Sequence, residues 1–446
     1  METTKISRRY LVPAAAAAFT ILPRGARGAN EKLNIAAVGF GGMGKEYIKG
    51  CANENIVALC DVDSVYSAPV VARYPNAKVY KDYRVMLEKE KAIDAVIVGT
   101  PDHAHAFVSM AAIRAGKAVY CAKPMTRTLH EVRAVTLAAR EAKVATQMSV
   151  QSCASDPACT TEEWVKSGAI GPVRDVHVWS DRPIWPQAVA RPLDAAVVPS
   201  GLDWDLWLGP APKRPYHPIY HPFNFRGWVD FGTGALGDMA CHAFHVIFRS
   251  LNLTHPLSVS ASIALVREPL IAERGYKSRT AKFPETYPHA SMITWDFPAR
   301  EGLPPVRMHW YDGGLTPPRP EGMDPVRRMP IDGMYFAGDK GVIWSGFSGG
   351  PSVLGDELKR SFVPPAKTVA RSSGHYLEWI AAAKGGPPAN CNFEFGGLIT
   401  ETALLGVVAQ RSPNRRLEWD SVNLRIPNDS VANELVNPPY RDGWSL

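Results

Sequence analysis

The sequence of 446 residues lacks the patterns that mark several specialised classes of protein. It contains no C-x-x-C motif, which argues against a zinc ribbon or a thioredoxin-type site. Lys and Arg are scattered and are not clustered among aromatic residues, so the net charge of +7 gives no support to nucleic-acid binding. There is no long internal repeat and no linker rich in Gly and Ser. The length therefore predicts two domains with a close interface.

The cysteines show no clear pairing pattern. There are seven of them, an odd number, so at least one is unpaired. Cys51, Cys60 and Cys121 lie in segments expected to form a core, where cysteine acts as a small apolar residue. Cys153 and Cys159 are the pair that could form a bridge in an oxidising compartment.

Long apolar runs are missing after residue 29, so no membrane span is predicted. Residues 1–29 are interpreted as a twin-arginine signal peptide. They contain Ser-Arg-Arg-Tyr-Leu at 7–11, an apolar run at 11–22 and small residues at 25–29. The run is shorter than the about 20 residues of a membrane helix, which favours removal as a signal. The alternative is an unstructured tail with a chance pair of arginines. The signal predicts export to the periplasm of a bacterium.

The stretch from Asn34 to Asp63 organises the rest of the chain. Residues 35–38 form a continuous apolar run, typical of a strand buried on both faces of a parallel sheet. The run leads into a G-x-G-x-x-G motif formed by Gly39, Gly41 and Gly44. In this motif the glycines permit a tight turn, close approach of a pyrophosphate and close packing of the next helix. We call residues 39–44 the glycine turn.

A second apolar run, 56–60, ends at Asp61. A carboxylate at this position accepts hydrogen bonds from ribose hydroxyls and repels a 2′-phosphate. This segment therefore contains, in order, a strand, the glycine turn, a helix, a second strand and an acidic residue. That order predicts a dinucleotide site that favours NAD over NADP. If the signal directs export, the NAD has to travel with the folded protein and stay bound.

Strands and helices continue to alternate up to about residue 152. Expected strands lie at 79–80, 95–98, 118–121 and 145–150, and expected helices at 83–89, 106–115 and 129–142. This alternation predicts an α/β Rossmann domain over residues 30–152. The loops 99–105 and 122–124 fall at the carboxyl ends of strands, where such sheets bind ligands.

Residues 153–446 are predicted to form an α+β domain with a large, mostly antiparallel open sheet. Strand-like segments occur at 173–179, 257–266, 290–297 and 306–311, with a hairpin over 334–344. Helices are expected at 161–167, 238–251, 375–383 and 398–409.

The chain resembles the Gfo/Idh/MocA family, which includes glucose–fructose oxidoreductase and inositol dehydrogenase. The resemblance runs from about residue 32 onward. It rests on Gly39-Phe40-Gly41-Gly42-Met43-Gly44, Thr100-Pro101 with His105, Cys121-Ala122-Lys123-Pro124, and Gly237-Asp238 with His242. The family usually has a glutamate where this chain has Ala122, and often an asparagine near Val150-Gln151-Ser152. Both differences bear on the geometry of hydride transfer.

The resemblance implies a set of cofactor-binding residues and a homo-oligomer, either a dimer or a tetramer. The expected NAD-binding residues are Gly39, Gly41, Gly42, Met43, Gly44, Asp61, Thr100, Pro101, His105 and Lys123.

Three residues are candidates for catalysis. Lys123 follows a predicted strand beside the expected nicotinamide, and Asp238 and His242 are four residues apart, so they share one face of a helix. The resemblance implies that these three form the catalytic set, with His242 or Lys123 as acid and base. The alternative is that Asp238 caps its helix and His242 is a buried structural residue. Asp238, His242 and His245 could also be imagined as metal ligands, but the aromatic loops supply no further ligand, so no metal is predicted.

Loops and strand ends of the second domain are rich in aromatic and polar residues. Aromatic faces stack on the C–H surfaces of sugar rings, while Arg, Asn and Gln bind hydroxyls. The expected substrate-binding residues are Arg182, Trp185, Gln187, Tyr220, Asn224, Arg226, His242 and Tyr311. The alternative for each of them is a role in sealing a domain or subunit interface.

Three functions are compatible with these residues. The first is an oxidoreductase that transfers a hydride between a tightly bound NAD and a carbon bearing a hydroxyl in a sugar or polyol. The second is an NAD-dependent glycoside hydrolase, which uses transient sugar oxidation, elimination, addition of water and re-reduction. The third is a sugar-binding or scaffold protein that retains the nucleotide without chemistry.

Overall fold

The structure, a computed structural model, describes residues 31–270, 277–300 and 302–446. The twin-arginine signal predicted for residues 1–29 lies outside the described residues. Within the described ranges, no helix is both long enough and apolar enough to cross a bilayer.

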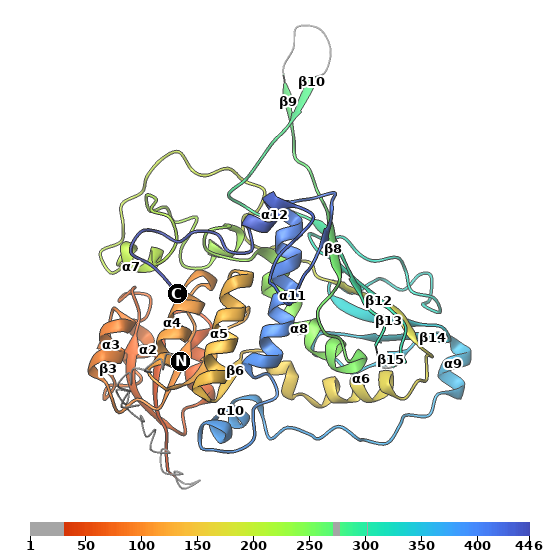
Figure 1. The fold of residues 1–446 in the computed structure, drawn as a ribbon, viewed down its shortest axis with the longest axis horizontal. Helices are drawn as coiled ribbons and strands as arrows, with labels where there is room; N and C mark the ends of the chain where they lie inside the picture. Colours follow the sequence, from red (N-terminus) through yellow and green to blue (C-terminus); the bar gives the residue numbers. More distant parts are fainter. Residues whose placement is uncertain (1–30, 271–276, 301) are drawn as a thin grey trace, which may run out of the picture.

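The first domain is built on a parallel sheet of six strands in the order β3-β2-β1-β4-β5-β6 (Figure 1). In this Rossmann order successive strands are added on one side of β1 up to β3 and then on the other side from β4 onward, and such sheets bind ligands at this change of order between β1 and β4. The strands are β1 (Asn34–Val38), β2 (Asn55–Cys60), β3 (Lys78–Tyr80), β4 (Ala95–Val98), β5 (Ala118–Cys121) and β6 (Thr146–Met148). The helices are α1 (Gly44–Gly50), α2 (Ala68–Val71), α3 (Tyr83–Lys89), α4 (Asp102–Arg114) and α5 (Leu129–Ala142).

Both faces of this sheet are covered, which explains why its strands are continuously apolar. Alternate residues of β1 point to opposite faces. Ala36 and Val38 pack in a core with α4 and α5, and Ile35 and Ala37 pack in a second core with α1. That second core also contains Trp379 from α10 (His375–Ala383), a helix from the far end of the chain.

The second domain contains a mixed sheet of eight strands in the order β15-β14-β13-β7-β12-β11-β8-β16. All neighbours are antiparallel except β7 and β12, which are parallel. Its strands are β7 (Val173–Trp179), β8 (Ser258–Ile263), β11 (Ser291–Phe297), β12 (Val306–Tyr311), β13 (Gly333–Gly338), β14 (Gly341–Ser345), β15 (Ser352–Val353) and β16 (Arg416–Glu418). A separate hairpin of β9 (Arg267–Leu270) and β10 (Lys277–Thr280) projects from the domain (Figure 1).

The two domains share one hydrophobic core. α8 (Gly234–Leu251) and α11 (Phe393–Arg411) pack on each other, and α11 also contacts α5 and β6 of the first domain and β8 and β11 of the second. The remaining helices are α6 (Asp156–Lys166), α7 (Trp204–Leu208), α9 (Asp356–Ser361) and α12 (Ser430–Glu434), with single 3₁₀ turns η1 (Gln151–Ala154) and η2 (Asn224–Gly227).

The predicted fold class is confirmed, and several local expectations are wrong. Residues 99–105 are not a continuous loop, because α4 begins at Asp102 and therefore carries His103 and His105. The helix expected from Asp238 begins four residues earlier, at Gly234. Cys153 and Cys159 do not form a bridge, since all seven cysteines are free and buried.

Candidate active site

A cavity of about 600 Å³ lies where the carboxyl edge of the parallel sheet faces the second domain. It is lined from the first domain by the glycine turn, by the end of β2, and by the segments that follow β4 and β5. It is lined from the second domain by η2, α8 and the loop that follows β7. One cavity thus brings together most of the residues predicted to bind the cofactor and all three predicted to be catalytic.

The glycine turn has the close contacts that its motif predicts. Gly39 has φ +75°, and a Cβ at this position would lie 2.7 Å from Thr100 N, so no larger residue fits. A Cβ on Gly44 would lie 2.1 Å from Gly39 O, because α1 begins directly against the turn. A Cβ on Gly41 would lie 2.0 Å from the ring of Tyr66, which packs across the turn.

Asp61 ends β2 beside this turn. Its two carboxylate oxygens accept hydrogen bonds from Phe40 N at 2.9 Å and from Asp63 N at 3.0 Å. Burial raises the pKa of the Asp61 carboxyl, and these N–H groups oppose that rise. Each oxygen keeps a second lone pair, and Asp61 lines the cavity, so the carboxylate is available to ribose hydroxyls.

The part of the cavity lined by the glycine turn, Asp61 and Thr100 fits a dinucleotide. The hydroxyl oxygen of Thr100 is buried and has no hydrogen-bond partner within the part of the chain that the structure describes. A ligand group would satisfy it. The backbone of the glycine turn provides the close approach that a pyrophosphate requires. The predicted cofactor residues that line the cavity are Gly39, Gly41, Gly42, Met43, Asp61, Thr100, Pro101, His105 and Lys123.

Two of the residues predicted to bind the cofactor have mainly structural roles. Gly44 does not line the cavity and serves the packing of α1. The ring nitrogens of His105 lie 2.7 Å from Thr100 O and 2.8 Å from Pro124 O. His105 therefore joins the two segments that follow β4 and β5, and its position in the first turn of α4 holds both against the cavity.

Lys123 follows β5, and its ammonium group reaches across the domain boundary to α8. Lys123 Nζ donates to the carboxylate of Asp238 at 2.7 Å and also to the backbone carbonyl of Asp238. Arg226 Nε donates to the same carboxylate oxygen at 3.1 Å. Burial alone would raise the pKa of Asp238, but the charges of Lys123 and Arg226 outweigh it and hold that pKa well below its usual range. Asp238 is therefore an anion clamped between two cations.

His242 lies one turn further along α8 and lines the same cavity. Its ring nitrogens have no hydrogen-bond partner among the described residues. Burial, assisted by the nearby charge of Lys123, lowers the pKa of His242 to about 3. The imidazole is therefore neutral near pH 7 and presents a free acceptor nitrogen to the cavity.

The helix-cap alternative for Asp238 is wrong, because this residue is the fifth of α8 and its side chain points to Lys123 and Arg226. His245 is buried, and its Nε2 lies 2.9 Å from Ser152 Oγ, so it supports the loop after β6 and does not line the cavity. No group of three or more His, Cys, Asp or Glu suited to a metal ion occurs in the described ranges.

The backbone of Lys123 is held by a short chain of hydrogen bonds. Lys123 N donates to Ser149 Oγ at 3.1 Å, and Ser149 Oγ lies 3.0 Å from the hydroxyl of Tyr47. Of the residues that replace the usual asparagine, Val150 is fully buried and Gln151 lines the cavity. Ala122 also lines the cavity.

The predicted substrate-binding residues separate into two groups. Arg182, Trp185, Arg226 and His242 line the cavity. Arg226 stacks on Phe223 with 4.8 Å from its guanidinium carbon to the ring centroid, so the cavity wall is aromatic as well as cationic.

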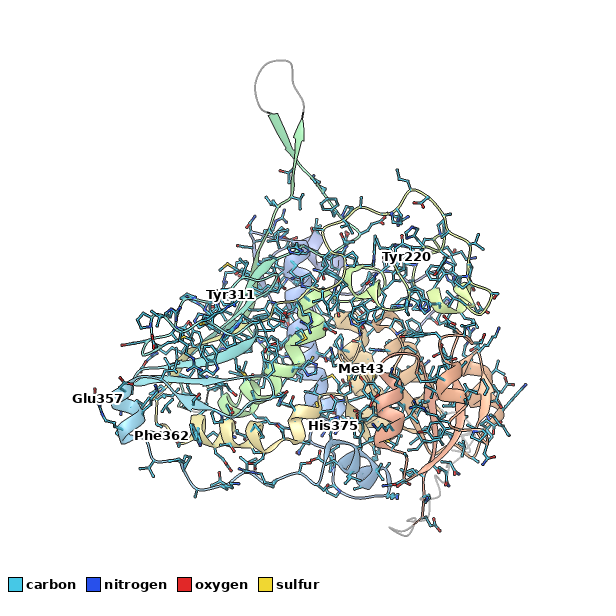
Figure 2. All side chains as sticks on the ribbon, turned by 180° about the vertical axis from the view of Figure 1, so that it is seen from behind. Met43, Tyr220, Tyr311, Glu357, Phe362 and His375 are labelled. Atoms are coloured by element: carbon cyan, nitrogen blue, oxygen red, sulfur yellow. The ribbon has the colours of Figure 1, made fainter. Side chains whose placement is uncertain are left out.

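Four of the predicted substrate residues do not line the cavity: Gln187, Tyr220, Asn224 and Tyr311. Gln187 is buried and accepts a hydrogen bond from Trp185 Nε1 at 2.9 Å, so it orients that ring from behind. Tyr220 is buried in an aromatic cluster with Trp228 and Phe231. Tyr311 ends β12 of the eight-stranded sheet, with its hydroxyl 3.0 Å from His177 Nδ1, and lies away from Met43 of the glycine turn (Figure 2).

Several residues that line the cavity were not predicted: Tyr66, Trp207, His221 and Trp444. His221 Nε2 lies 2.9 Å from Asp63 Oδ2, and so connects the second domain to the segment after β2. No local motif marks these residues. They come together because segments distant in the sequence fold over the glycine turn.

The fold and the cavity define a two-domain protein with a Rossmann dinucleotide site that faces a domain of mixed sheet. Residues 33–150 match the family model described as "Oxidoreductase family, NAD-binding Rossmann fold". Residues 179–265 match the model described as "Oxidoreductase family, C-terminal alpha/beta domain". Both segments thus match models of the Gfo/Idh/MocA oxidoreductase family, and the first of these models is an NAD-binding domain.

Known relatives are similar over part of the chain. Inositol 2-dehydrogenase of Salmonella typhimurium is 28% identical over 203 residues, which is 44% of this chain and 54% of the relative. Levoglucosan dehydrogenase of Pseudarthrobacter phenanthrenivorans is 23% identical over 223 residues, 48% of this chain and 49% of the relative. The alignments thus span about half of these relatives.

A solved structure shares the fold over most of the chain. The WlbA dehydrogenase from Bordetella pertussis, in complex with NADH and UDP-GlcNAcA, has a TM-score of 0.58 at 17% identity. The superposition covers 87% of this chain and 99% of that one.

Proposed function

We propose that this protein is an NAD-dependent dehydrogenase that oxidises a hydroxyl of a sugar or polyol. The observation that carries the proposal is the meeting of Lys123, Asp238 and His242 in the cavity lined by the glycine turn. Names of the related dehydrogenases, which include inositol and levoglucosan dehydrogenases, support this substrate class.

We assign His242, on the cavity wall, the role of accepting the hydroxyl proton. It is neutral, faces the cavity and has free ring nitrogens. Lys123, in contrast, uses two of its three donors on Asp238, so its ammonium group is fixed in place. We assign Lys123 the role of donating its remaining N–H to the substrate oxygen, which stabilises the negative charge that develops there.

Asp238 keeps this arrangement in place. Its carboxylate holds Lys123 and Arg226 together, and one turn of α8 separates it from His242, so the orientation of the helix sets the distance between ammonium and imidazole. NAD, held by the glycine turn, Asp61 and Thr100, would supply the acceptor for the hydride. Trp185 and Arg182 would bind the face and the hydroxyls of a sugar ring.

The test is direct. Purified protein is incubated with NAD and a panel of inositols, aldoses and anhydrosugars, and the absorbance band of NADH is followed. We expect growth of this band with at least one free sugar or polyol, and we expect His242→Ala to lower the rate of that reaction by about a hundredfold or more. A His242→Ala protein with unchanged turnover would contradict the role of the histidine.

The glycosidase hypothesis predicts a different result. An aryl glycoside would then be cleaved with no net change in NADH. The relatives named above are dehydrogenases and give this hypothesis no support. Adding aryl glycosides to the panel, in assays separate from those with free sugars, decides between the two functions.

Two further parts of the proposal follow from the sequence and the family resemblance. We propose export through the twin-arginine pathway with NAD tightly bound. Replacing Arg8 and Arg9 by lysine should then leave the protein in the cytoplasm, as fractionation would show. We also propose a homo-oligomer, which sedimentation of the purified protein would test.

A further inference from the structure

The cavity continues past Asp61 into a compartment on the side away from Lys123. β3 lies beyond β2 in the sheet, whereas β5, which precedes Lys123, lies on the opposite side of β1. The compartment is therefore where the adenosine half of a dinucleotide would lie, if its pyrophosphate rests on the glycine turn. Its walls include Val62, Lys81, Tyr83, Phe107, Pro210 and Trp444.

Trp444 closes this compartment from outside the Rossmann domain. Its ring meets Phe107 of α4 edge-on, with centroids 5.4 Å apart. The guanidinium of Arg84 lies over the same ring at 5.0 Å, and Arg84 is itself fixed by Asp82 at 2.7 Å. The indole is thus held by contacts with both α3 and α4 while it lines the cavity.

The segment that carries Trp444 is fastened to the second domain. Arg441 Nη1 donates to Asp205 Oδ1 of α7 at 2.7 Å, and Arg441 N donates to Pro210 O at 2.9 Å. Tyr440 adds an edge-on contact with Phe107 at 5.0 Å. Figure 1 shows this last stretch of chain running past α7 and the end of α4.

A second fastening joins the same region to the segment after β2. Asp203 N donates to Val62 O at 2.8 Å, and Ser64 N donates to Gly201 O at 2.9 Å. Asp63 forms an isolated β-bridge with Leu202. Residues 201–210 are therefore bonded directly to the residues that follow Asp61.

We propose that residues 201–210 and 440–446 form a clasp over the adenosine half of NAD, with Trp444 against the adenine, and that this clasp keeps NAD bound through many turnovers. The inference rests on the proposed function for the identity of the ligand, and it adds the residues that retain it. An adenine enclosed between Trp444 and the Rossmann domain leaves when the contacts of Arg441 with α7 and Pro210 open. The substrate side of the cavity, near Arg182 and Trp185, needs no such opening.

The experiment measures release of the cofactor and needs no turnover. Protein loaded with radiolabelled NAD is chased with excess unlabelled NAD, and the remaining label is followed. We expect Trp444→Ala to release NAD about tenfold faster or more, in line with the loss of a base-stacking aromatic. Asp205→Asn, which keeps the indole and weakens the fastening of Arg441, should also speed release. Glu434→Ala, at an exposed position of α12 outside the clasp, is the matched control and should release NAD at the parent rate.

Competition by fragments locates the effect. AMP should bind Trp444→Ala more weakly than the parent by a similar factor, whereas nicotinamide mononucleotide should bind both equally. Parent-like release in Trp444→Ala and Asp205→Asn would overturn the clasp, and so would an equal loss of affinity for the two fragments. Failure of the proposed function looks different: the variants release NAD faster, but no sugar or polyol is oxidised by the parent.

Discussion

Lys123 and Asp238 lie 2.7 Å apart, nitrogen to oxygen, and come from different domains. The lysine follows a strand of the parallel sheet and the aspartate sits in the first turns of α8, so this ion pair closes the cavity at the point where a nicotinamide and a substrate would meet. Arg226 binds the same carboxylate oxygen from η2. This contact between the two domains therefore fixes the position of Lys123, to which we assign a catalytic role.

Removing the lysine should separate catalysis from cofactor binding. We expect Lys123→Ala to lower turnover by about a thousandfold, because the developing charge on the substrate oxygen loses its donor. Binding of NAD, measured by calorimetry, should change little, since the glycine turn and Asp61 are untouched. Lys213→Ala, an exposed lysine, is the control. Turnover at the parent rate in Lys123→Ala would rule out this role.

Asp61 should exclude NADP by its charge. Asp61→Asn removes the negative charge and keeps one oxygen that can accept from Phe40 N, whereas its NH₂ group replaces the oxygen that accepts from Asp63 N. We expect the preference for NAD over NADP, measured as the ratio of the two dissociation constants, to fall by about tenfold or more, since the like-charge repulsion of the 2′-phosphate disappears. An unchanged ratio would show that another residue sets the preference.

The glycine turn offers a rescue experiment. Gly41→Ala should weaken NAD binding, because the new Cβ would lie 2.0 Å from the ring of Tyr66 and one of the two must move. If that contact is the cause, the double variant Gly41→Ala with Tyr66→Ser should recover part of the affinity. Equal affinities of the single and double variants would show that the methyl group itself blocks the pyrophosphate.

The stability of the fold should fall in mild acid. Burial lowers the pKa of His103 to about 4 from its ordinary value near 6.5. Below about pH 6.5 the unfolded chain binds a proton that the folded protein does not, so the free energy of unfolding decreases as the pH falls towards 4. For His103 this amounts to about 2 kcal/mol between pH 7.5 and pH 5. His375, with a pKa lowered to about 3, adds in the same direction.

Urea unfolding at pH 7.5 and at pH 5 measures this difference. His103→Gln should reduce it, whatever its effect on stability at either pH, and His289→Gln, at an exposed position, should not. A pH difference that is identical in His103→Gln and the parent would contradict the assignment.

The sequence predicts the parts of this site that are local. The glycine turn, Asp61, and the strand that leads to Lys123 all depend on neighbouring residues, and the structure places them on one edge of the sheet. The starts of α4 and α8 depend on contacts between domains. Asp102 Oδ2 accepts from Thr233 Oγ1 at 2.7 Å, and this bond fixes the first turns of both helices together. No pattern within either segment reveals such a contact.

Prediction from the sequence is limited in the same way for the residues on the substrate side of the cavity. Composition indicates that the loops are aromatic, but it does not say which rings face a ligand. Tyr220 and Trp185 are equally suited to a sugar by residue type, and Tyr220 packs in an aromatic cluster while Trp185 lines the cavity. Trp444 lies about four hundred residues from the glycine turn in the sequence, so its place in the cavity depends on the whole fold.

The position of α10 and α11 has a consequence for synthesis on the ribosome. Trp379 of α10 completes the core on one face of the first sheet, and Cys391 O accepts a hydrogen bond from Met148 N at 2.8 Å beside β6. The first 150 residues to emerge therefore cannot finish folding until most of the chain has been translated. A nascent chain stalled before α10 should be cut by protease within the Rossmann sheet, and one stalled after α11 should resist.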